Sequence, residues 1–202
     1  MNLAAVQIVK ASPRNAYALS VLTREYFDYA QLSQDKILER LRSNGFEYWL
    51  ARAGGKLAGF IDVDFTPIQG LRNADGNAPQ GNAPGFLVEA AASAPQAPNT
   101  AFGARVGRGA KRKGTPKAKQ AKILGLAVLP EFRGRGIAKK LIAKAVSRAN
   151  ARGCREVFLL VREDNAAAQR LYAAIGFELR GALAEKMWGQ RILLYAKELK
   201  KK

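Results

Sequence analysis

The chain has 202 residues, of which 48% are apolar, and carries a formal net charge of +18 from 34 Lys and Arg against 16 Asp and Glu. This length and apolar content predict one folded domain with a buried core, spanning residues 1–202. The chain contains no histidine and a single cysteine, Cys154. Imidazole-based catalysis, zinc sites built on histidine or cysteine clusters, and an internal disulfide are therefore excluded. No metal is expected, and any chemistry must use carboxylates, tyrosines, lysines, backbone dipoles and water.

The distribution of apolar residues predicts a cytoplasmic protein that does not enter a membrane. No stretch approaches the roughly 20 apolar residues of a membrane span. The first residues also lack the basic start, apolar run and cleavage site of a signal peptide. The single cysteine fits a reducing compartment. Cys154 stands just before an apolar run, so we expect a structural side chain rather than a nucleophile.

Two helices are predicted in the first 45 residues. Ser12-Pro13 indicates a helix start, because serine caps the first turn and proline fits its first position. Ser33 indicates a second start, and Asn44-Gly45 ends that helix. Apolar residues recur on one face of each helix: Ala16, Leu19 and Leu22 in the first, and Ile37, Leu38 and Leu41 in the second. This spacing predicts faces that pack on a core.

A β-hairpin is predicted over residues 47–53 and 57–65, with its turn at Gly54-Gly55. Along the second strand, apolar residues alternate with carboxylates: Ile61, Val63 and Phe65 with Asp62 and Asp64. Alternation of this kind puts the two aspartates on the opposite face from the apolar side chains. We expect both carboxylates to be solvated or to cap a helix N-terminus.

The composition changes abruptly over residues 67–120 to Gly, Ala, Pro, Asn and Gln, without a sustained hydrophobic period. Such a segment buries too little apolar surface to offset its ordering entropy. It is predicted to be a low-complexity insertion, mobile at its tip, in which residues 86–88 and the alanine-rich stretch after them fit either a short helix or a short strand. The insertion ends in a basic cluster of Arg105, Arg108, Lys111, Arg112, Lys113, Lys117 and Lys119.

The segment from Ile123 to Ala138 predicts a site for a phosphorylated cofactor. A short apolar run leads into a loop that contains Gly134 and Gly136, and a helix follows. Small side chains leave the backbone N–H groups of such a loop uncovered, and the helix N-terminus adds partial positive charge. Arg133 and Arg135 place full charges beside it.

The glycine spacing narrows the class of cofactor site. A dinucleotide-binding turn has G-x-G-x-x-G directly after its strand. This chain instead has G-R-G-I-A-K after a four-residue lead-in, with no first βαβ unit before it. The stretch from Gly109 to Thr115 lacks the lysine that follows the second glycine of a P-loop. Both alternatives are therefore disfavoured.

A helix, a strand and a second helix are predicted after the loop. Apolar residues from Ile137 to Val146 recur at three- and four-residue spacing, so an amphipathic helix runs from the loop to about Gly153. Residues 157–161 suit a strand buried on both faces. Asn165 caps the next helix and Gly176 closes it. This order predicts an α/β fold with a partly parallel sheet and a ligand at the carboxyl ends of its strands.

Two sequence patterns in this half resemble signatures of the GCN5-related N-acetyltransferase (GNAT) family. Arg133, Gly136 and Ala138 match the pattern R/Q-x-x-G-x-G/A of its acetyl-CoA pyrophosphate loop, and residues 165–177 match N-x-x-A-x-x-L-Y-x-x-x-G-F. The resemblance implies a GNAT-like mixed, partly parallel central sheet flanked by helices. Residues 67–120 would then be a long insertion between the third and fourth strands, where the family usually has only a tight turn.

The same resemblance implies a set of site residues. The exposed backbone of Leu126, Ala127 and Val128 would hold the pantetheine arm of acetyl-CoA like an added strand, with an N–H there polarising the thioester carbonyl. The pyrophosphate loop comprises Arg133, Gly134, Arg135, Gly136, Ile137 and Ala138. Tyr172 matches the family tyrosine that protonates the leaving thiolate, and Asn165 matches the polar group beside the pantetheine. The alternative for Tyr172 is a core aromatic whose hydroxyl bonds a backbone carbonyl.

By resemblance, the chain moves an acetyl group directly from acetyl-CoA, a co-substrate used without a metal, to a primary amine such as a protein N-terminus or a lysine. The strand before Asn165 is similar to that of the ribosomal-protein N-terminal acetyltransferases, but their acidic residue on this strand falls on Leu160 here. The general base therefore stays open. The alternatives are the carboxylates Asp62, Asp64, Glu163 and Asp164, or a water relay.

The net charge supports a separate expectation about partners. A charge of +18 favours salt-dependent association with polyanions. The basic insertion and the Lys200–Lys202 tail are therefore predicted to contact a ribosome or a nucleic acid. An alternative function uses the same fold without catalysis, as an acetyl-CoA-binding sensor or as a ribosome- or nucleic-acid-associated module.

Overall fold

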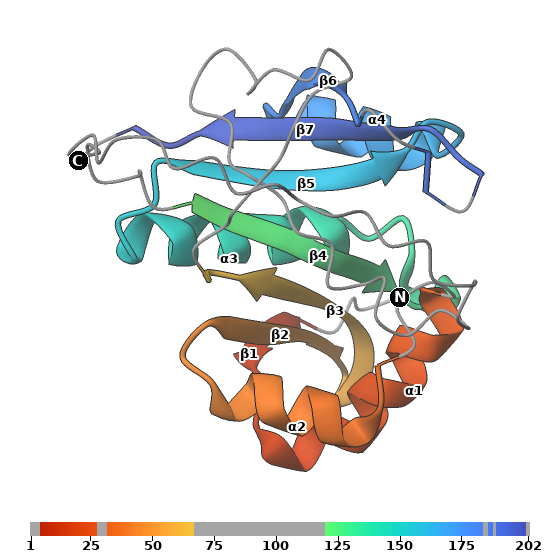
Figure 1. Cartoon of the computed structure of the whole chain (residues 1–202). Coiled ribbons are helices and arrows are strands. Elements are labelled where there is room, and N and C mark those ends of the chain that lie inside the picture. Colours follow the sequence, from red (N-terminus) through yellow and green to blue (C-terminus); the bar gives the residue numbers. More distant parts are fainter. Residues whose placement is uncertain (1–4, 28–31, 67–119, 184–185, 188, 201–202) are drawn as a thin grey trace, which may run out of the picture.

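The computed structural model describes residues 5–27, 32–66, 120–183, 186–187 and 189–200. Their seven strands form one sheet in the order β1-β2-β3-β4-β5-β7-β6. The strands are β1 Val6–Lys10, β2 Phe46–Ala53, β3 Lys56–Asp64, β4 Gln120–Val128, β5 Glu156–Arg162, β6 Glu178–Ala182 and β7 Ile192–Glu198. Neighbouring strands are antiparallel except β4 and β5, which are parallel. The predicted mixed, partly parallel sheet is confirmed (Figure 1).

The two strands that border the predicted insertion are neighbours in the sheet. Asp64, at the end of β3, lies opposite Lys122 of β4. The predictions for residues 67–119 lie outside the described residues. Gln120, the last residue of the predicted insertion, begins β4.

Two serine residues mark where the helices of the first 45 residues begin. Ser12 precedes a 3-10 turn, Pro13–Asn15, that leads into α1 (Ala16–Tyr26). Ser33 caps α2 (Gln34–Arg42) by accepting a hydrogen bond from the backbone N–H of Lys36 at 3.2 Å. Both helices bury apolar side chains against the same face of the sheet, over β2 and β3.

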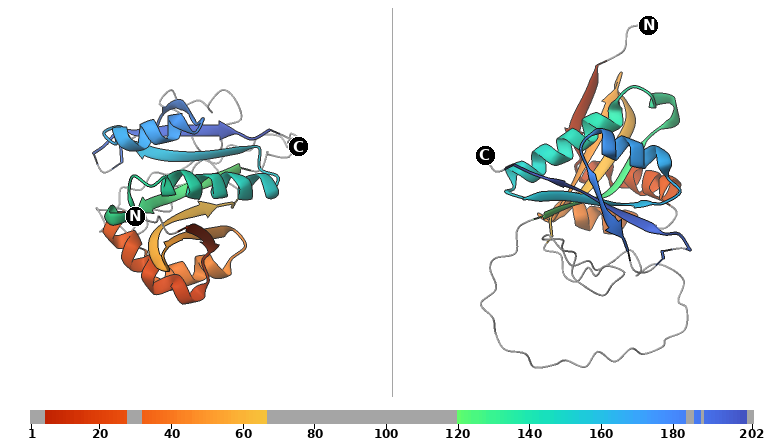
Figure 2. Two further views of the ribbon diagram at one scale, coloured as in Figure 1. Left: turned by 180° about the vertical axis from the view of Figure 1, so that it is seen from behind. Right: turned by 90° about the horizontal axis from the view of Figure 1, so that it is seen from above.

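The opposite face of the sheet is covered by α3 (Ile137–Ala151) and α4 (Ala166–Ala174), as the views in Figures 1 and 2 show. Leu141, Ile142 and Ala145 of α3 are buried in the main core. Cys154 is buried just before β5, where a structural side chain was expected. The sheet therefore lies between two helical layers, and α3 crosses the middle of it.

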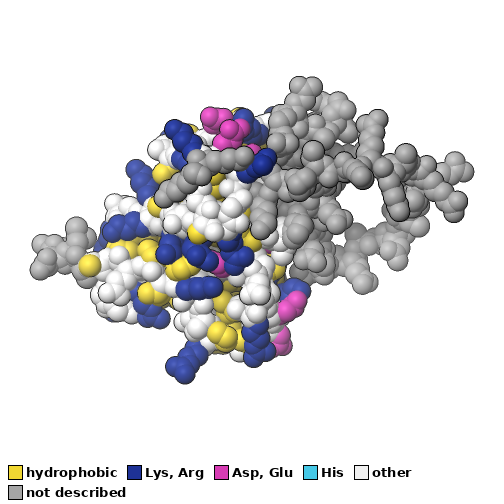
Figure 3. All heavy atoms as spheres, turned by 90° about the vertical axis from the view of Figure 1, so that its left-hand side faces the viewer, with side chains coloured by type: hydrophobic (Ala, Val, Ile, Leu, Met, Phe, Trp, Pro, Cys, Tyr) yellow, Lys and Arg dark blue, Asp and Glu magenta, His cyan; other side chains and the backbone are white. Residues whose placement is uncertain are grey.

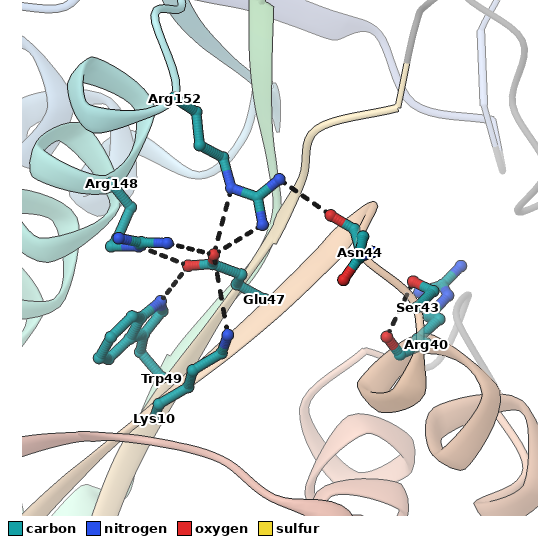
Figure 4. Close-up of polar contacts among 8 residues, drawn as sticks. All are labelled: Lys10, Arg40, Ser43, Asn44, Glu47, Trp49, Arg148 and Arg152. Atoms are coloured by element: carbon teal, nitrogen blue, oxygen red, sulfur yellow. Dashed lines mark hydrogen bonds and ion pairs between the residues drawn. The ribbon is translucent and has the colours of Figure 1, made fainter.

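A buried carboxylate ties α3 to β2 (Figure 4). Glu47 of β2 accepts hydrogen bonds from Arg148 at 2.7 and 2.9 Å and from Arg152 at 2.8 and 3.2 Å. The indole N–H of Trp49 donates a further one at 3.1 Å. The ammonium of Lys10 lies 3.9 Å from the carboxylate, whose side chain has no exposed surface. We call these five residues the Glu47 cluster.

The Glu47 carboxylate is held in its ionised form. Burial alone would raise its pKa, but the hydrogen bonds from Arg148, Arg152 and Trp49 outweigh burial and lower the pKa from 4.5 to about 2. Arg148 is in the last turn of α3 and Arg152 directly follows that helix. The cluster therefore fixes the C-terminal end of α3 against the sheet.

We expect Glu47→Gln to lower the free energy of unfolding by about 3 kcal/mol, because it leaves two partly buried guanidinium groups without their counter-ion. Urea denaturation at neutral pH measures the change. The matched control is Glu39→Gln, since Glu39 pairs with Lys36 at the exposed surface of α2 and such pairs contribute at most about 1 kcal/mol. Equal losses in the two variants would contradict the role assigned to Glu47.

Comparing the wild-type protein with Glu47→Gln at different pH values tests the direction of the Glu47 pKa shift. Because the folded-state pKa of Glu47 lies below its ordinary value of 4.5, its stabilising contribution is complete above about pH 4.5 and disappears as the pH falls toward 2. The difference in unfolding free energy between wild type and Glu47→Gln should shrink over this range. A difference that stays constant would show that the carboxylate is not held ionised.

Candidate functional site

A gap opens between the two parallel strands. β4 pairs with β5 only from Gln120–Ile123 to Glu156–Leu159. Beyond that point β4 stays paired with β3 and β5 with β7, and Figure 1 shows the two strands diverging toward their carboxyl ends. The edge of β4 that faces β5 therefore has no strand partner over residues 124–128.

Along β4, the backbone N–H and C=O groups of successive residues point alternately to β3 and to the gap. The N–H of Leu129 donates to the carbonyl of Ala58, beside β3, at 3.0 Å. Alternate residues of an antiparallel strand direct their polar groups to the same neighbour, so Ala127 and Gly125 also face β3. Leu126 and Val128 face the gap. Ala127 lies opposite Phe60 of β3, so by this alternation its backbone faces that strand, while Leu126 and Val128 offer theirs to the gap.

The loop between β4 and α3 forms an open anion cradle. A 3-10 turn, Pro130–Phe132, follows β4. Gly134 and Gly136 then have φ angles of 74° and 72°, which only glycine adopts without strain. A Cβ added to either residue would meet no atom within 4 Å. The first-turn N–H groups of Ile137, Ala138 and Lys139 have no carbonyl partner in α3, so the loop presents backbone donors to open space.

Two arginines are anchored beside this cradle by backbone carbonyls. The Nε of Arg133 donates to the Val128 carbonyl at 3.0 Å, and Arg135 donates to the Glu131 carbonyl at 2.9 Å. The guanidinium of Arg135 also lies over the Phe132 ring, 5.4 Å from its centroid. These contacts hold two positive charges next to the start of α3, which has no acidic residue in its first turn. The arrangement suits a phosphate or pyrophosphate.

The predicted residues of α4 lie on the β5 side of the gap. Asn165 caps α4, because its side-chain oxygen accepts a hydrogen bond from the N–H of Ala168 at 3.1 Å. The Tyr172 ring packs against Phe177 and Tyr195, with centroids 5.9 and 6.4 Å apart. Within the described residues its hydroxyl has no hydrogen-bond partner, a backbone carbonyl included. Burial raises the pKa of Tyr172 to about 12, which keeps the phenol protonated at neutral pH.

Three of the four candidate carboxylates are already engaged. Glu163 pairs with Arg191 at 3.2 Å, and Asp164 binds Arg162 through both of its oxygens, at 2.6 and 3.0 Å. The side chain of Asp64 accepts hydrogen bonds from the N–H and hydroxyl groups of Thr66, both at 2.7 Å. These contacts stabilise turns at the ends of β5 and β3 and leave the carboxylates poorly placed for proton transfer.

Asp62 differs from the other three and corrects the expectation of a solvated side chain. It is 5% exposed, and its Oδ1 has no hydrogen-bond partner among the described residues. Asp62 lies opposite Gly125. A Cβ at Gly125 would come within 2.7 Å of the Asp62 Oδ1 and 3.1 Å of the Phe27 ring. The glycine therefore allows a carboxylate to lie against β4, beside the residue whose backbone faces the gap.

The chain can now be placed among known proteins. Residues 15–177 match the model of the acetyltransferase (GNAT) family. The match spans most of the chain, so the chain belongs to that family. The family and the diverging parallel strands agree with the GNAT-like fold that the sequence patterns predicted.

Individual relatives share shorter stretches. An acetyltransferase of Pectobacterium atrosepticum is 47% identical over 53 residues, which are 26% of this chain and 38% of that protein. The ribosomal protein bS18-alanine N-acetyltransferase of Haemophilus ducreyi is 41% identical over 58 residues, or 29% of this chain and 40% of the relative. The chain thus matches less than half the length of these curated relatives.

Solved structures share the fold over nearly the whole chain. NAA60 of Arabidopsis thaliana in complex with acetyl-CoA has a TM-score of 0.64 at 19% identity, covering 96% of this chain and 99% of that one. The ribosomal-protein-S18-alanine N-acetyltransferase of Escherichia coli has a TM-score of 0.60 at 14% identity, covering 96% and 94%. At these identities the likeness is one of fold.

Among the described residues, no helix combines the length and the apolar character that crossing a membrane requires. These residues also contain no group of three or more acidic or cysteine side chains that could hold a metal ion.

Proposed function

We propose that the protein is an N-acetyltransferase that moves an acetyl group from acetyl-CoA to a primary amine. The observation that carries the proposal is the gap between β4 and β5, where an edge of β4 without a strand partner leads directly into the anion cradle at the start of α3. An elongated ligand with a pyrophosphate at one end matches both parts of this site. Membership of the GNAT family supports the same conclusion.

The geometry suggests how acetyl-CoA would lie. Its pyrophosphate would accept hydrogen bonds from the loop of Arg133, Gly134, Arg135 and Gly136 and from the first N–H groups of α3. Its pantetheine arm would run back along β4 and bond the backbone of Val128 and Leu126 like an added strand. In this position the N–H of Leu126 would donate to the thioester carbonyl and polarise it.

The amide nitrogen of Asn165, whose oxygen caps α4, is available from the other side of the gap.

Direct transfer then needs few groups. The acceptor nitrogen attacks the thioester carbonyl carbon, a C–N bond forms, and the C–S bond breaks. Tyr172 would give its phenolic proton to the leaving thiolate, and the raised pKa of the buried phenol keeps that proton in place until then.

The named relatives favour a protein acceptor. The Haemophilus ducreyi relative acts on an alanine of ribosomal protein bS18, and Naa50 of Arabidopsis thaliana, with a TM-score of 0.61, was solved with a peptide-containing bisubstrate analogue. We infer that the acceptor amine of this protein belongs to a protein chain, as an N-terminus or as a lysine.

The anion cradle predicts how a methyl group added at Gly136 changes the affinity for acetyl-CoA. Gly136→Ala should weaken acetyl-CoA binding several-fold, because Ala disfavours the left-handed backbone that aims the loop N–H groups. Isothermal titration calorimetry measures the dissociation constant. Gly153→Ala is the matched control, since Gly153 follows the other end of α3 with a φ of 71° and open space around it. Equal binding by the two variants would contradict the assignment of the loop.

The enzymatic proposal is tested by release of free CoA from acetyl-CoA with acceptor peptides, free amines and a no-acceptor control. We expect acceptor-dependent release, and Tyr172→Phe should lower turnover at least tenfold while acetyl-CoA affinity changes less than twofold. Tight binding of acetyl-CoA without release to any acceptor would favour the sensor alternative. Unchanged turnover in Tyr172→Phe would remove the acid role.

We also infer that the protein associates with a polyanion such as a ribosome or a nucleic acid. Its net charge is +18. In Figure 3, which shows the left-hand side of Figure 1, Lys and Arg side chains (dark blue) outnumber acidic ones (magenta). This side is remote from the carboxyl end of β4 (Figure 1), so a bound polyanion would leave the gap open.

Fluorescence anisotropy with a labelled single-stranded RNA tests this association. Because each neutralised phosphate releases counterions, the affinity should fall at least tenfold between ~50 and ~200 mM salt. An affinity that does not change with salt, or no binding at low salt, would contradict the inference.

A further inference from the structure

Three buried polar atoms in the described part of the chain lack a hydrogen-bond partner: Nε of Arg40, the hydroxyl oxygen of Tyr48 and Oδ1 of Asp62. Unpaired polar atoms are rare in protein interiors and call for an explanation. Tyr48 and Asp62 lie directly opposite each other on β2 and β3. The charge of Arg40, on α2, acts on both of them. The three atoms therefore belong to one polar site beneath α2.

This polar site reaches the gap between β4 and β5 through Gly125. The Asp62 carboxylate lies against the backbone of Gly125, where no larger residue would fit beside Phe27. Leu126 is the next residue along β4, and it is the one whose N–H faces the gap. Since a strand advances about 3.3 Å per residue, the Gly125 backbone against which Asp62 lies is one residue from the N–H group proposed to hold the thioester.

The titratable groups around Asp62 come from every element packed against it. Arg40 contributes from α2, Tyr48 from β2, Asp64 from β3 itself and Lys122 from β4, while Phe27 at the end of α1 adds an apolar wall. Burial raises the pKa of Asp62 to about 7, although Arg40, Lys122 and the N–H groups of Asp62 and Gly125 oppose the rise. A carboxylate of this kind is ionised part of the time at neutral pH and can both take up and release a proton.

We propose that Asp62 is the general base that removes the proton from the acceptor ammonium. The proposal rests on the acetyl transfer proposed above and names the residue that the sequence left open. Among the four carboxylates considered, Asp62 combines burial, an unpaired oxygen and a position beside the gap. The other three are bound to Arg191, Arg162 or Thr66.

The proton balance of the reaction closes with this assignment. The ionised Asp62 takes one proton from the acceptor ammonium, and the resulting amine attacks the thioester. The new C–N bond forms and the C–S bond breaks, while Tyr172 protonates the thiolate. The second proton leaves the nitrogen as the amide forms and restores Tyr172 through solvent, and Asp62 releases its proton to water. The net products are an amide, free CoA and one proton.

The strength of this base suits one class of acceptor. An α-amino group has an ordinary pKa of about 8, whereas a lysine side chain has one of about 10.4. A base whose pKa is about 7 takes a proton from the former far more readily than from the latter. The assay therefore uses a peptide with a free N-terminal alanine.

The pH dependence of kcat at saturating acetyl-CoA and peptide tests the proposal, because this constant reports groups in the bound complex. Wild-type kcat should fall as the pH drops through about 7, since the base must be ionised. Asp62→Asn should lower kcat at least 100-fold and abolish that decline, with acetyl-CoA affinity changed less than twofold. A kcat within threefold of wild type, with the decline retained, would overturn the proposal.

Two matched variants exclude other sources of the decline. Asp64→Asn changes a carboxylate two residues away that caps Thr66. Glu156→Gln removes a carboxylate whose pKa burial raises to about 6 but which lies at the far, paired end of β5. Both should retain the decline in kcat at low pH, and a lost decline in either would overturn the assignment to Asp62.

A measurement on the wild-type protein keeps the proposal testable if Asp62→Asn does not fold. Carbon-13 NMR of the aspartate carboxyl groups should show Asp62 titrating near pH 7, and titration below pH 5 would overturn the proposal. A wild-type protein that binds acetyl-CoA but acetylates no amine would overturn the proposed function. By contrast, an active Asp62→Asn variant would overturn this inference alone.

Discussion

The position of α3 depends on the Glu47 cluster at one of its ends. A buried carboxylate bound by two guanidinium groups is costly to separate, because each charge would lose its partner in a site with little water. The N-terminal end of the same helix supplies the loop donors of the proposed pyrophosphate site. Since a helix of this length behaves as a stiff rod, a contact made at Arg148 and Arg152 helps to set where Gly136 meets the end of β4.

Signals that act over a few residues were readable from the sequence. The Asn165 cap and the hairpin at Gly54-Gly55 each depend on local backbone chemistry, and the structure places them where predicted. The parallel pairing of β4 with β5 followed from the strand, helix, strand order. The two sequence patterns pointed to the family, which the match over residues 15–177 confirms.

Features that depend on distant partners were not readable. Asp62 alternates with apolar residues as a solvated side chain would, but residues distant in the sequence, Phe27 and Gly125 among them, lie against it. Glu47 acquires its partners from a helix about one hundred residues further along the chain. The register of β4 with β3, including an irregularity near Val63, decides which backbone groups face the gap. It directs those of Leu126 and Val128 to the gap and those of Ala127 to β3. No short window of sequence contains that information.

The pairing of β3 with β4 has a consequence for how the domain folds. Asp64 and Lys122 are direct cross-strand neighbours, yet residues 65–121 separate them, so a contact that a tight turn would make local has become long-range. Closing so long a loop costs only about 2 kcal/mol more than closing a short one, because the penalty grows with the logarithm of length. The larger effect is kinetic: the contact order of the central sheet rises, and folding should be slower than in a domain of the same architecture with a short turn here.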